Sequence, residues 1–148
     1  MAEIPAKLTD LVAMLQGLGR MERIEMLIGL ADRFREVPES IAQRPFGEEF
    51  KVPACESEAF LWAQPQDDGT LKFHFAVENP QGISAKAMAV ILDEGLSGES
   101  VREVAQVDGE IIYEIFGREL SMGKSMGLMG MVSMARNSAR KLLEEAVS

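Results

Sequence analysis

Cys55, the only cysteine in the 148-residue sequence, is the side chain with the clearest capacity for chemistry. A cysteine thiolate can attack sulfur or an acyl carbon and can carry away the group that it takes up. A solitary cysteine can also be a small buried apolar residue with no chemical role. The local sequence favours the first interpretation. Pro53 disfavours a helix, and an apolar run begins only at Ala59, after intervening polar residues. We therefore expect an exposed thiol on a loop that enters a strand.

The cysteine precedes a pattern that predicts a β-hairpin. Apolar residues alternate with others along residues 71–77, which is the period of a strand with one face on a core. Residues 57–64 predict a second strand. Residues 65–70 lie between the two strands and include an Asp-Gly step, a common turn signal. The loop at Cys55 is therefore expected to lead into the first strand of an antiparallel pair.

Apolar residues at helical spacing predict two helices before the cysteine. The first covers residues 8–18 and the second covers residues 24–37, with glycines interrupting the pattern between them. Pro38 sets the end of the second helix, because the residue before a proline disfavours helical geometry. We expect the two helices to form a short antiparallel pair. Residues 38–49 are polar or turn-forming and predict a loop that delivers the chain to the cysteine.

Further helices are predicted after the hairpin. Residues 83–92 predict a helix that is broken by Gly95 and Gly98, and residues 101–104 predict a short one. Residues 111–116 are apolar, but their length leaves helix and strand open. The final segment has apolar residues on one helical face and predicts a long closing helix, with Ser125 as its candidate cap.

Composition indicates one soluble globular domain spanning residues 1–148. Hydrophobic residues make up 47% of the chain and charged residues 26%, which is ordinary for a globular core. With 15 basic and 24 acidic residues, the formal net charge is −9, which disfavours nucleic acid and anionic membranes as partners. No apolar run is long enough to span a membrane, and the first residues lack the features of a signal peptide. We expect a cytoplasmic protein whose single thiol forms no internal disulfide.

The sequence predicts no metal site and no bound cofactor. One cysteine and one histidine cannot assemble a zinc or iron–sulfur ligand set within one chain. Residues 117–125 end in Gly-Lys-Ser, but their spacing differs from that of a phosphate-binding loop. The methionines near the start of the closing helix could bind copper(I), although packing explains them better. His74 is the only imidazole that could serve Cys55 as a base.

Three segments resemble the SufE family (SufE/CsdE-like sulfur acceptors), small proteins that take persulfide sulfur from a cysteine desulfurase. Residues 54–61, Ala-Cys-Glu-Ser-Glu-Ala-Phe-Leu, are similar to the family signature Gly-Cys-x-Ser-x-x-Trp followed by a hydrophobic residue. Residues 86–88, Lys-Ala-Met before an apolar helix, resemble the family's Lys-Gly-Leu segment. Residues 120–128, Leu-Ser-Met-Gly-Lys-Ser-Met-Gly-Leu, resemble Leu-[Ser/Thr]-Pro-Ser-Arg-x-x-Gly-Leu. With the paired amino-terminal helices, the resemblance covers nearly the whole chain.

The resemblance implies an α+β fold of the SufE/IscU-like type. In such a fold, an antiparallel sheet that includes the 57–77 hairpin packs against the amino-terminal helix pair and the long carboxy-terminal helix. The resemblance also favours a helix for residues 111–116.

The resemblance further implies a function. Cys55 would accept persulfide sulfur from a SufS-like cysteine desulfurase, activate that enzyme by unloading it, and pass the sulfur to a downstream iron–sulfur scaffold. The expected chemistry is thiol–disulfide exchange with one transferred sulfur atom. Pyridoxal phosphate is expected on the partner desulfurase only, and the acceptor needs no cofactor and no turnover of its own. Ser57 would hydrogen-bond to the loop backbone or the sulfur, and Lys124 would favour the thiolate by its charge.

Three residues depart from the family pattern. Ala54 stands where the family has glycine, so positive φ is less accessible there. Phe60 replaces the usual tryptophan, and Trp62 lies two residues along on the same strand face. Lys124 replaces an arginine, which keeps the charge without the planar guanidinium. The acceptor role remains the favoured interpretation, with these departures bearing on the choice of partner.

Two other functions are compatible with the sequence. Cys55 could be the nucleophile of an enzyme that acts on a small substrate, with His74 as its base. Loss of activity toward a small thiol ester in His74→Ala would favour that enzyme. Alternatively, the protein could be a binding module that engages a partner through its paired helices or its methionine-rich helix, with a structural cysteine. Unchanged partner binding and partner activity in Cys55→Ser would favour the binding module.

Overall fold

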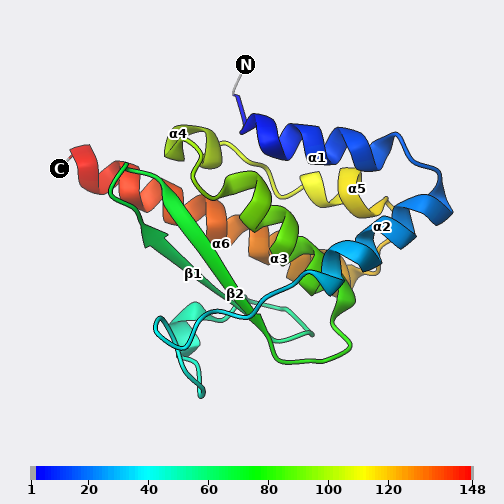
Figure 1. Cartoon of the computed structure of the whole chain (residues 1–148), viewed down its shortest axis with the longest axis horizontal. Coiled ribbons are helices and arrows are strands. Elements are labelled where there is room, and N and C mark those ends of the chain that lie inside the picture. The colour runs from blue at the N-terminus through cyan, green and yellow to red at the C-terminus, as the bar shows by residue number, and fades with distance from the viewer. Residues whose placement is uncertain (1–2, 148) are drawn as a thin grey trace.

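The computed structural model describes residues 3–147, and in this part of the chain one β-hairpin packs beside α3 (Ile83–Leu96) and α6 (Met122–Val147) (Figure 1). β1 (Ala59–Pro65) pairs antiparallel with β2 (Leu71–Val77), with Ala59 opposite Val77 at one end and Pro65 opposite Leu71 at the other. In the turn, Gly69 adopts a φ of 84°, and the Asp68 carboxylate accepts hydrogen bonds from the backbone N–H and hydroxyl of Thr70. The predicted hairpin is confirmed.

The first strand begins two residues later than predicted, at Ala59 rather than at residue 57. Glu58 adopts a φ of 52°, which lies in the left-handed region and interrupts the extended backbone. The cysteine segment is therefore set off from the strand by a sharp change of backbone direction.

The two amino-terminal helices are confirmed as α1 (Ala6–Gln16) and α2 (Arg20–Asp32). Both pack chiefly on α3 (Ile83–Leu96) and touch each other little, so α3 rather than a helix pair organises this half of the molecule. The prediction that the second helix reaches Val37 is wrong. The chain leaves the helix after Asp32 because the N–H of Val37 donates to the Phe75 carbonyl (2.8 Å), which draws this segment alongside β2.

The central helix α3 continues through Gly95, where the sequence predicted a break. A Cβ at position 95 would lie 3.0 Å from Leu8 Cβ, so the glycine lets α1 approach α3 closely. The chain turns after Leu96, at the second predicted break, Gly98, which has a φ of 78°. Two short helices follow, α4 (Val101–Val104) and α5 (Ile111–Phe116), so residues 111–116 are helical.

The closing helix α6 (Met122–Val147) begins three residues before the predicted cap. Ser121 caps it, because its Oγ accepts the backbone N–H of Lys124 (3.2 Å). Ser125 lies inside the first turn, where its hydroxyl donates to the Met122 carbonyl (3.0 Å), so the prediction of Ser125 as the cap is wrong. Within residues 3–147, no helix has the length and apolar character needed to cross a membrane.

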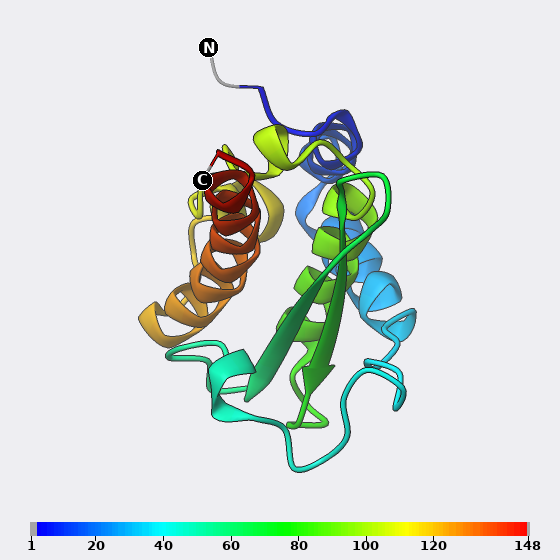
Figure 2. The same cartoon turned by 90° about the vertical axis from the view of Figure 1, so that its left-hand side faces the viewer.

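Both faces of the hairpin are buried. The inner face carries Phe73 and Phe75 into the main core. Helices α3 and α6 complete this core, and Figure 2 shows both of them beside the hairpin. The outer face carries Phe60 and Trp62, whose rings stack at a centroid distance of 6.2 Å. The segment before the cysteine, which includes the short 3-10 helix η1 (Glu48–Phe50), covers this outer face. We call the residues gathered there the outer cluster: Val37, Ile41, Ala42, Phe46, Phe50, Phe60, Trp62 and Ala76.

Candidate functional site

Cys55 lies in a six-residue loop, residues 53–58, that is closed at its base by backbone pairing; we call it the Cys55 loop. The N–H of Val52 donates to the Ala59 carbonyl (2.8 Å), and Lys51 forms an antiparallel bridge with Phe60. Phe60 belongs to the outer cluster, so the aromatic residues behind the sheet anchor the base of the loop. The loop therefore extends from a rigid support and presents the cysteine near its tip.

The loop contains two residues with left-handed backbone conformations. Ala54 has a φ of 57° and Glu58 has a φ of 52°, and between them the Glu58 N–H donates to the Cys55 carbonyl (3.0 Å). The substitution of alanine for the family glycine was expected to make positive φ less accessible, yet Ala54 adopts it. Left-handed geometry costs a residue with a Cβ about 1–2 kcal/mol, so the loop is held in a strained conformation at this position.

Glycines on α6 form the surface against which the loop rests. A Cβ at Gly127 would lie 3.1 Å from Cys55 Cα and 3.4 Å from the Ala54 carbonyl oxygen. A Cβ at Gly130 would lie 3.0 Å from the Pro53 carbonyl oxygen. In Figure 2 the loop lies beneath the orange amino-terminal end of α6, far from the red carboxy terminus of the chain. The absence of side chains at these positions lets the loop backbone lie directly on the helix.

The segment after β2 holds the loop from its other side. The N–H of Glu78 donates to the Glu58 carbonyl and the N–H of Asn79 donates to the Ser57 carbonyl, both at 3.1 Å. Gly82 lies so close to Ser57 that a Cβ there would be 2.9 Å from the serine Oγ. The tip of the loop is thus held between α6 and the connection from β2 to α3.

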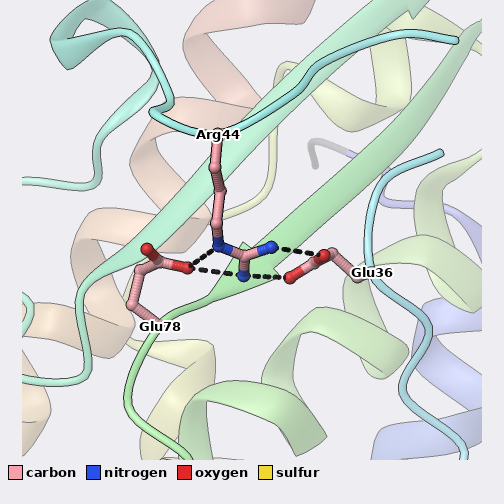
Figure 3. A network of polar contacts seen from close by, with 3 residues as sticks. All are labelled: Glu36, Arg44 and Glu78. Carbon is pink, nitrogen blue, oxygen red and sulfur yellow. Dashed lines mark hydrogen bonds and ion pairs between the residues drawn. The ribbon is translucent and has the colours of Figure 1, made fainter. Parts of the chain in front are cut away.

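An exposed ion-pair network ties the same connection to the segment that covers the hairpin (Figure 3). Arg44 donates from Nε to Glu78 Oε1 (2.9 Å) and from Nη1 to Glu36 Oε2 (2.8 Å), and its Nη2 bonds to both carboxylates. The hydrogen bonds from Arg44 hold the pKa of Glu36 below its usual value. The network links the residues just after α2 and just before η1 to the end of β2, one residue from Asn79.

Cys55 is half-buried and lines a pocket of about 310 Å³, which we call the Cys55 pocket. Ser57 and Lys124, the two supporting residues named from the sequence, line the same pocket, together with Asn79 and Ser84. A second hollow, of about 510 Å³, is also lined by Cys55, together with residues of the preceding segment. The cysteine therefore borders two hollows at the surface.

The structure does not bring His74 to the cysteine. His74 lies opposite Trp62 in the middle of the hairpin, and among the described residues neither pocket at Cys55 includes it. Partial burial lowers the pKa of His74, and the nearby Lys72 lowers it further, with Asp93 opposing the shift. The arrangement does not support a Cys–His pair of the kind that a thiol enzyme uses. Within residues 3–147, no three His, Cys, Asp or Glu side chains are grouped so that they could hold a metal ion.

Comparison with known proteins places the chain in a family. A family model described as "SufE: Fe-S metabolism associated domain" matches residues 9–139. The chain belongs to the SufE family. The solution structure of a hypothetical protein from Thermus thermophilus is similar to it, with a TM-score of 0.73 and 25% sequence identity, covering 95% of this chain and 98% of that one. Comparison with curated proteins gives no match.

Several residues of this SufE-family site were not identified from the sequence. Gly127 and Gly130 contact the Cys55 loop. Gly127 stands at the glycine of the motif in residues 120–128, but nothing in the sequence indicated that either glycine lies against the loop. The Arg44 network had no signal, because its three charged residues lie in different segments and are ordinary in their local context. Contacts of this kind depend on the tertiary arrangement.

Proposed function

We propose that this SufE-family protein accepts persulfide sulfur from a cysteine desulfurase onto Cys55 and passes it on for iron–sulfur cluster assembly. The observation that carries the proposal is the placement of the one thiol in the chain: half-buried, near the tip of a loop, and in a pocket that it shares with a lysine. The absence of a second cysteine from the sequence supports the same role, because a resolving thiol would discharge the sulfur as a disulfide.

The proposed transfer is an exchange without net oxidation. The Cys55 thiolate attacks the terminal sulfur of the donor's cysteine persulfide, and a new sulfur–sulfur bond forms at Cys55. The bond within the donor persulfide breaks, and its electron pair leaves on the donor's cysteine thiolate. The proton of the terminal sulfur stays with that sulfur or is lost to solvent. Pyridoxal phosphate belongs to the earlier chemistry of the donor, which produces the persulfide.

Residues of the pocket would assist the exchange in distinct ways. The ammonium of Lys124 would stabilise the attacking thiolate and then the anionic persulfide through its charge. The hydroxyl of Ser57, which lies in the same pocket, would donate a hydrogen bond to the bound sulfur. The support at the base of the loop would let the tip move toward the donor while the outer cluster stays in place. A reducing compartment such as the cytoplasm suits this role, because it keeps the thiol free.

The proposal is tested by mixing the protein with a cysteine desulfurase and free cysteine and measuring intact mass. Wild type should gain one sulfur atom, and Cys55→Ser should gain none. Ser133→Ala, a change of a half-buried serine on α6 away from the pocket, serves as a matched control and should load like wild type. A sulfur adduct on Cys55→Ser, or no adduct on wild type, would show that Cys55 does not accept sulfur from this class of donor.

A further inference from the structure

A groove beside the Cys55 pocket combines an apolar floor with a cationic rim. It has a volume of about 700 Å³ and lies between α2, the first turns of α3 and the connection from α5 to α6; we call it the α2 groove. α2 and the start of α3 lie side by side on the right of Figure 1. The apolar residues that define the floor come from all three parts of the groove: Ile24, Leu27, Ile28, Ile83, Phe116 and Leu120.

Three isoleucines of this groove are exposed to a degree that is unusual for their type. Ile24, Ile28 and Ile83 have 45%, 44% and 49% of their surface accessible. Ile24 and Ile28 are one helical turn apart on α2, so they present a continuous apolar ridge. Large apolar residues gathered in one place and bordered by polar ones are typical of a protein interaction site.

The rim of the groove has a charge opposite to that of the protein as a whole. Four cationic side chains and one carboxylate line the groove, whereas the whole chain has a formal net charge of −9. Arg20 pairs with Glu119 at 3.3 Å, but both side chains are about 80% exposed, and such a pair stabilises the protein little. Arg118 lines the groove, and its guanidinium lies 5.6 Å from the centre of the Tyr113 ring. A cationic surface on an acidic protein favours an acidic partner.

The groove is continuous with the Cys55 pocket. Ile83, Ser84 and Lys124 line both. A segment bound in the α2 groove therefore ends beside the pocket that holds the thiol. The apolar ridge with its cationic border matches an amphipathic segment that places apolar side chains on the isoleucines and carboxylates at the arginines.

We propose that the α2 groove docks an acidic, amphipathic segment of the sulfur-donating desulfurase and so places the donor persulfide beside Cys55. This inference rests on the acceptor function proposed above and adds the surface that recognises the donor. Docking in this groove contributes to binding and orientation, whereas the exchange itself takes place in the Cys55 pocket.

The test compares two sulfur donors and two matched pairs of variants. Ile28→Glu and Arg118→Glu alter the groove. Met14→Glu and Arg102→Glu make the same changes at exposed positions on α1 and α4, outside the groove. Each protein is loaded either by a cysteine desulfurase or by the small donor cysteine persulfide, and sulfur on Cys55 is followed by mass. Binding to the desulfurase is measured by titration at low and at high salt.

Ile28→Glu should weaken binding to the desulfurase about tenfold or more, as loss of a central interface residue does. Arg118→Glu should weaken it by placing a like charge opposite the acidic segment on the rim. The concentration needed for half-maximal loading should rise by a similar factor, and Arg118→Glu should also reduce the salt dependence of binding. Loading by cysteine persulfide should stay unchanged, which shows that the variants are folded and their thiols accessible. Met14→Glu and Arg102→Glu should match wild type with both donors.

Three results would overturn the inference. Groove variants that bind the desulfurase and load from it like wild type would show that the donor docks elsewhere. A wild-type dimer that Ile28→Glu dissociates, detected by sedimentation, would assign the groove to a second copy of this chain. Failure of wild type to load from the desulfurase while it loads from cysteine persulfide would remove the acceptor function, and the inference with it.

Discussion

Replacing Gly127 by alanine tests whether the Cys55 loop rests directly on α6. The matched control is Gly29→Ala in α2, where an added Cβ meets no atom within 4 Å. Alanine in place of glycine inside a helix stabilises the protein by about 0.5–1 kcal/mol, and Gly29→Ala should show this gain. At Gly127 the new methyl group would lie 3.1 Å from Cys55 Cα, compared with roughly 3.5–4.0 Å for ordinary carbon contacts.

The loop should yield to this methyl group, because α6 is fixed in the core by buried residues such as Met131 and Val132. Overpacking costs about 1–3 kcal/mol. The change in the free energy of unfolding caused by Gly127→Ala should therefore be about 1–3 kcal/mol less favourable than the change caused by Gly29→Ala. If the contact between the Cys55 loop and α6 is weakened by about 1 kcal/mol, the fraction of molecules in which the loop is displaced rises roughly fivefold. The rate at which an aromatic disulfide reagent modifies Cys55 should rise by about the same factor.

The two measurements are urea unfolding for stability and stopped-flow modification for thiol reactivity. Gly29→Ala should react at the wild-type rate. If Gly127→Ala gains as much stability as Gly29→Ala and its thiol reacts no faster, the loop does not rest on the glycine surface and the reasoning fails.

Three further changes test the local physical arguments. Ala54→Gly should stabilise the protein by about 0.5–1 kcal/mol in urea unfolding, because glycine relieves the left-handed strain. The control Ala13→Gly in α1 should destabilise the protein by a similar amount. A loss of stability in Ala54→Gly would show that this position is not strained. Because the pKa of His74 is lowered in the folded protein, the unfolded chain binds more protons than the folded one. Stability should therefore fall as the pH is lowered from about 7.5 to about 5.5. Thermal melts of His74→Gln should show a weaker dependence of stability on pH over that range. Arg44 lowers the pKa of Glu36, so the stabilisation that this carboxylate gives is present above its ordinary pKa and is lost on acidification. Arg44→Gln should therefore be less stable than wild type at neutral pH and equal to it in acid, and a gap that persists in acid would assign the loss to packing on Phe46.

The regular elements of this fold could be predicted from the sequence because their signals are local. Helical spacing in α1 and α2 reflects one buried face, and alternation along β2 reflects the face that enters the main core. The structure departs from these predictions where a tertiary contact overrides a local signal. Gly95 was predicted to break the helix, but it lets Leu8 of α1 approach α3 closely. The hydrogen bond from the Val37 N–H to the Phe75 carbonyl of β2 accompanies an earlier end of α2 than its apolar spacing predicted.

The site could be predicted in part. The sequence singled out Cys55, Ser57 and Lys124, and the structure places all three around one pocket although Lys124 is far from the others along the chain. The cationic α2 groove could not be foreseen, because its residues come from three separate segments and the overall charge is acidic. The role of Gly127 and Gly130 as a surface for the loop could not be recognised without knowing that the loop lies on α6.

The contacts at the loop tip set how easily the thiol can leave its resting position. Two backbone bonds hold the tip from outside the loop, from Glu78 to the Glu58 carbonyl and from Asn79 to the Ser57 carbonyl. At about 0.5–1.5 kcal/mol net each, they restrain the tip by about 1–3 kcal/mol, and the strain at Ala54 offsets part of this. A micromolar complex releases about 8 kcal/mol, so a docking donor can displace the tip at a small cost in affinity. Loading of the thiol should therefore depend on the contacts that the donor makes with this protein more than on the resting exposure of the sulfur.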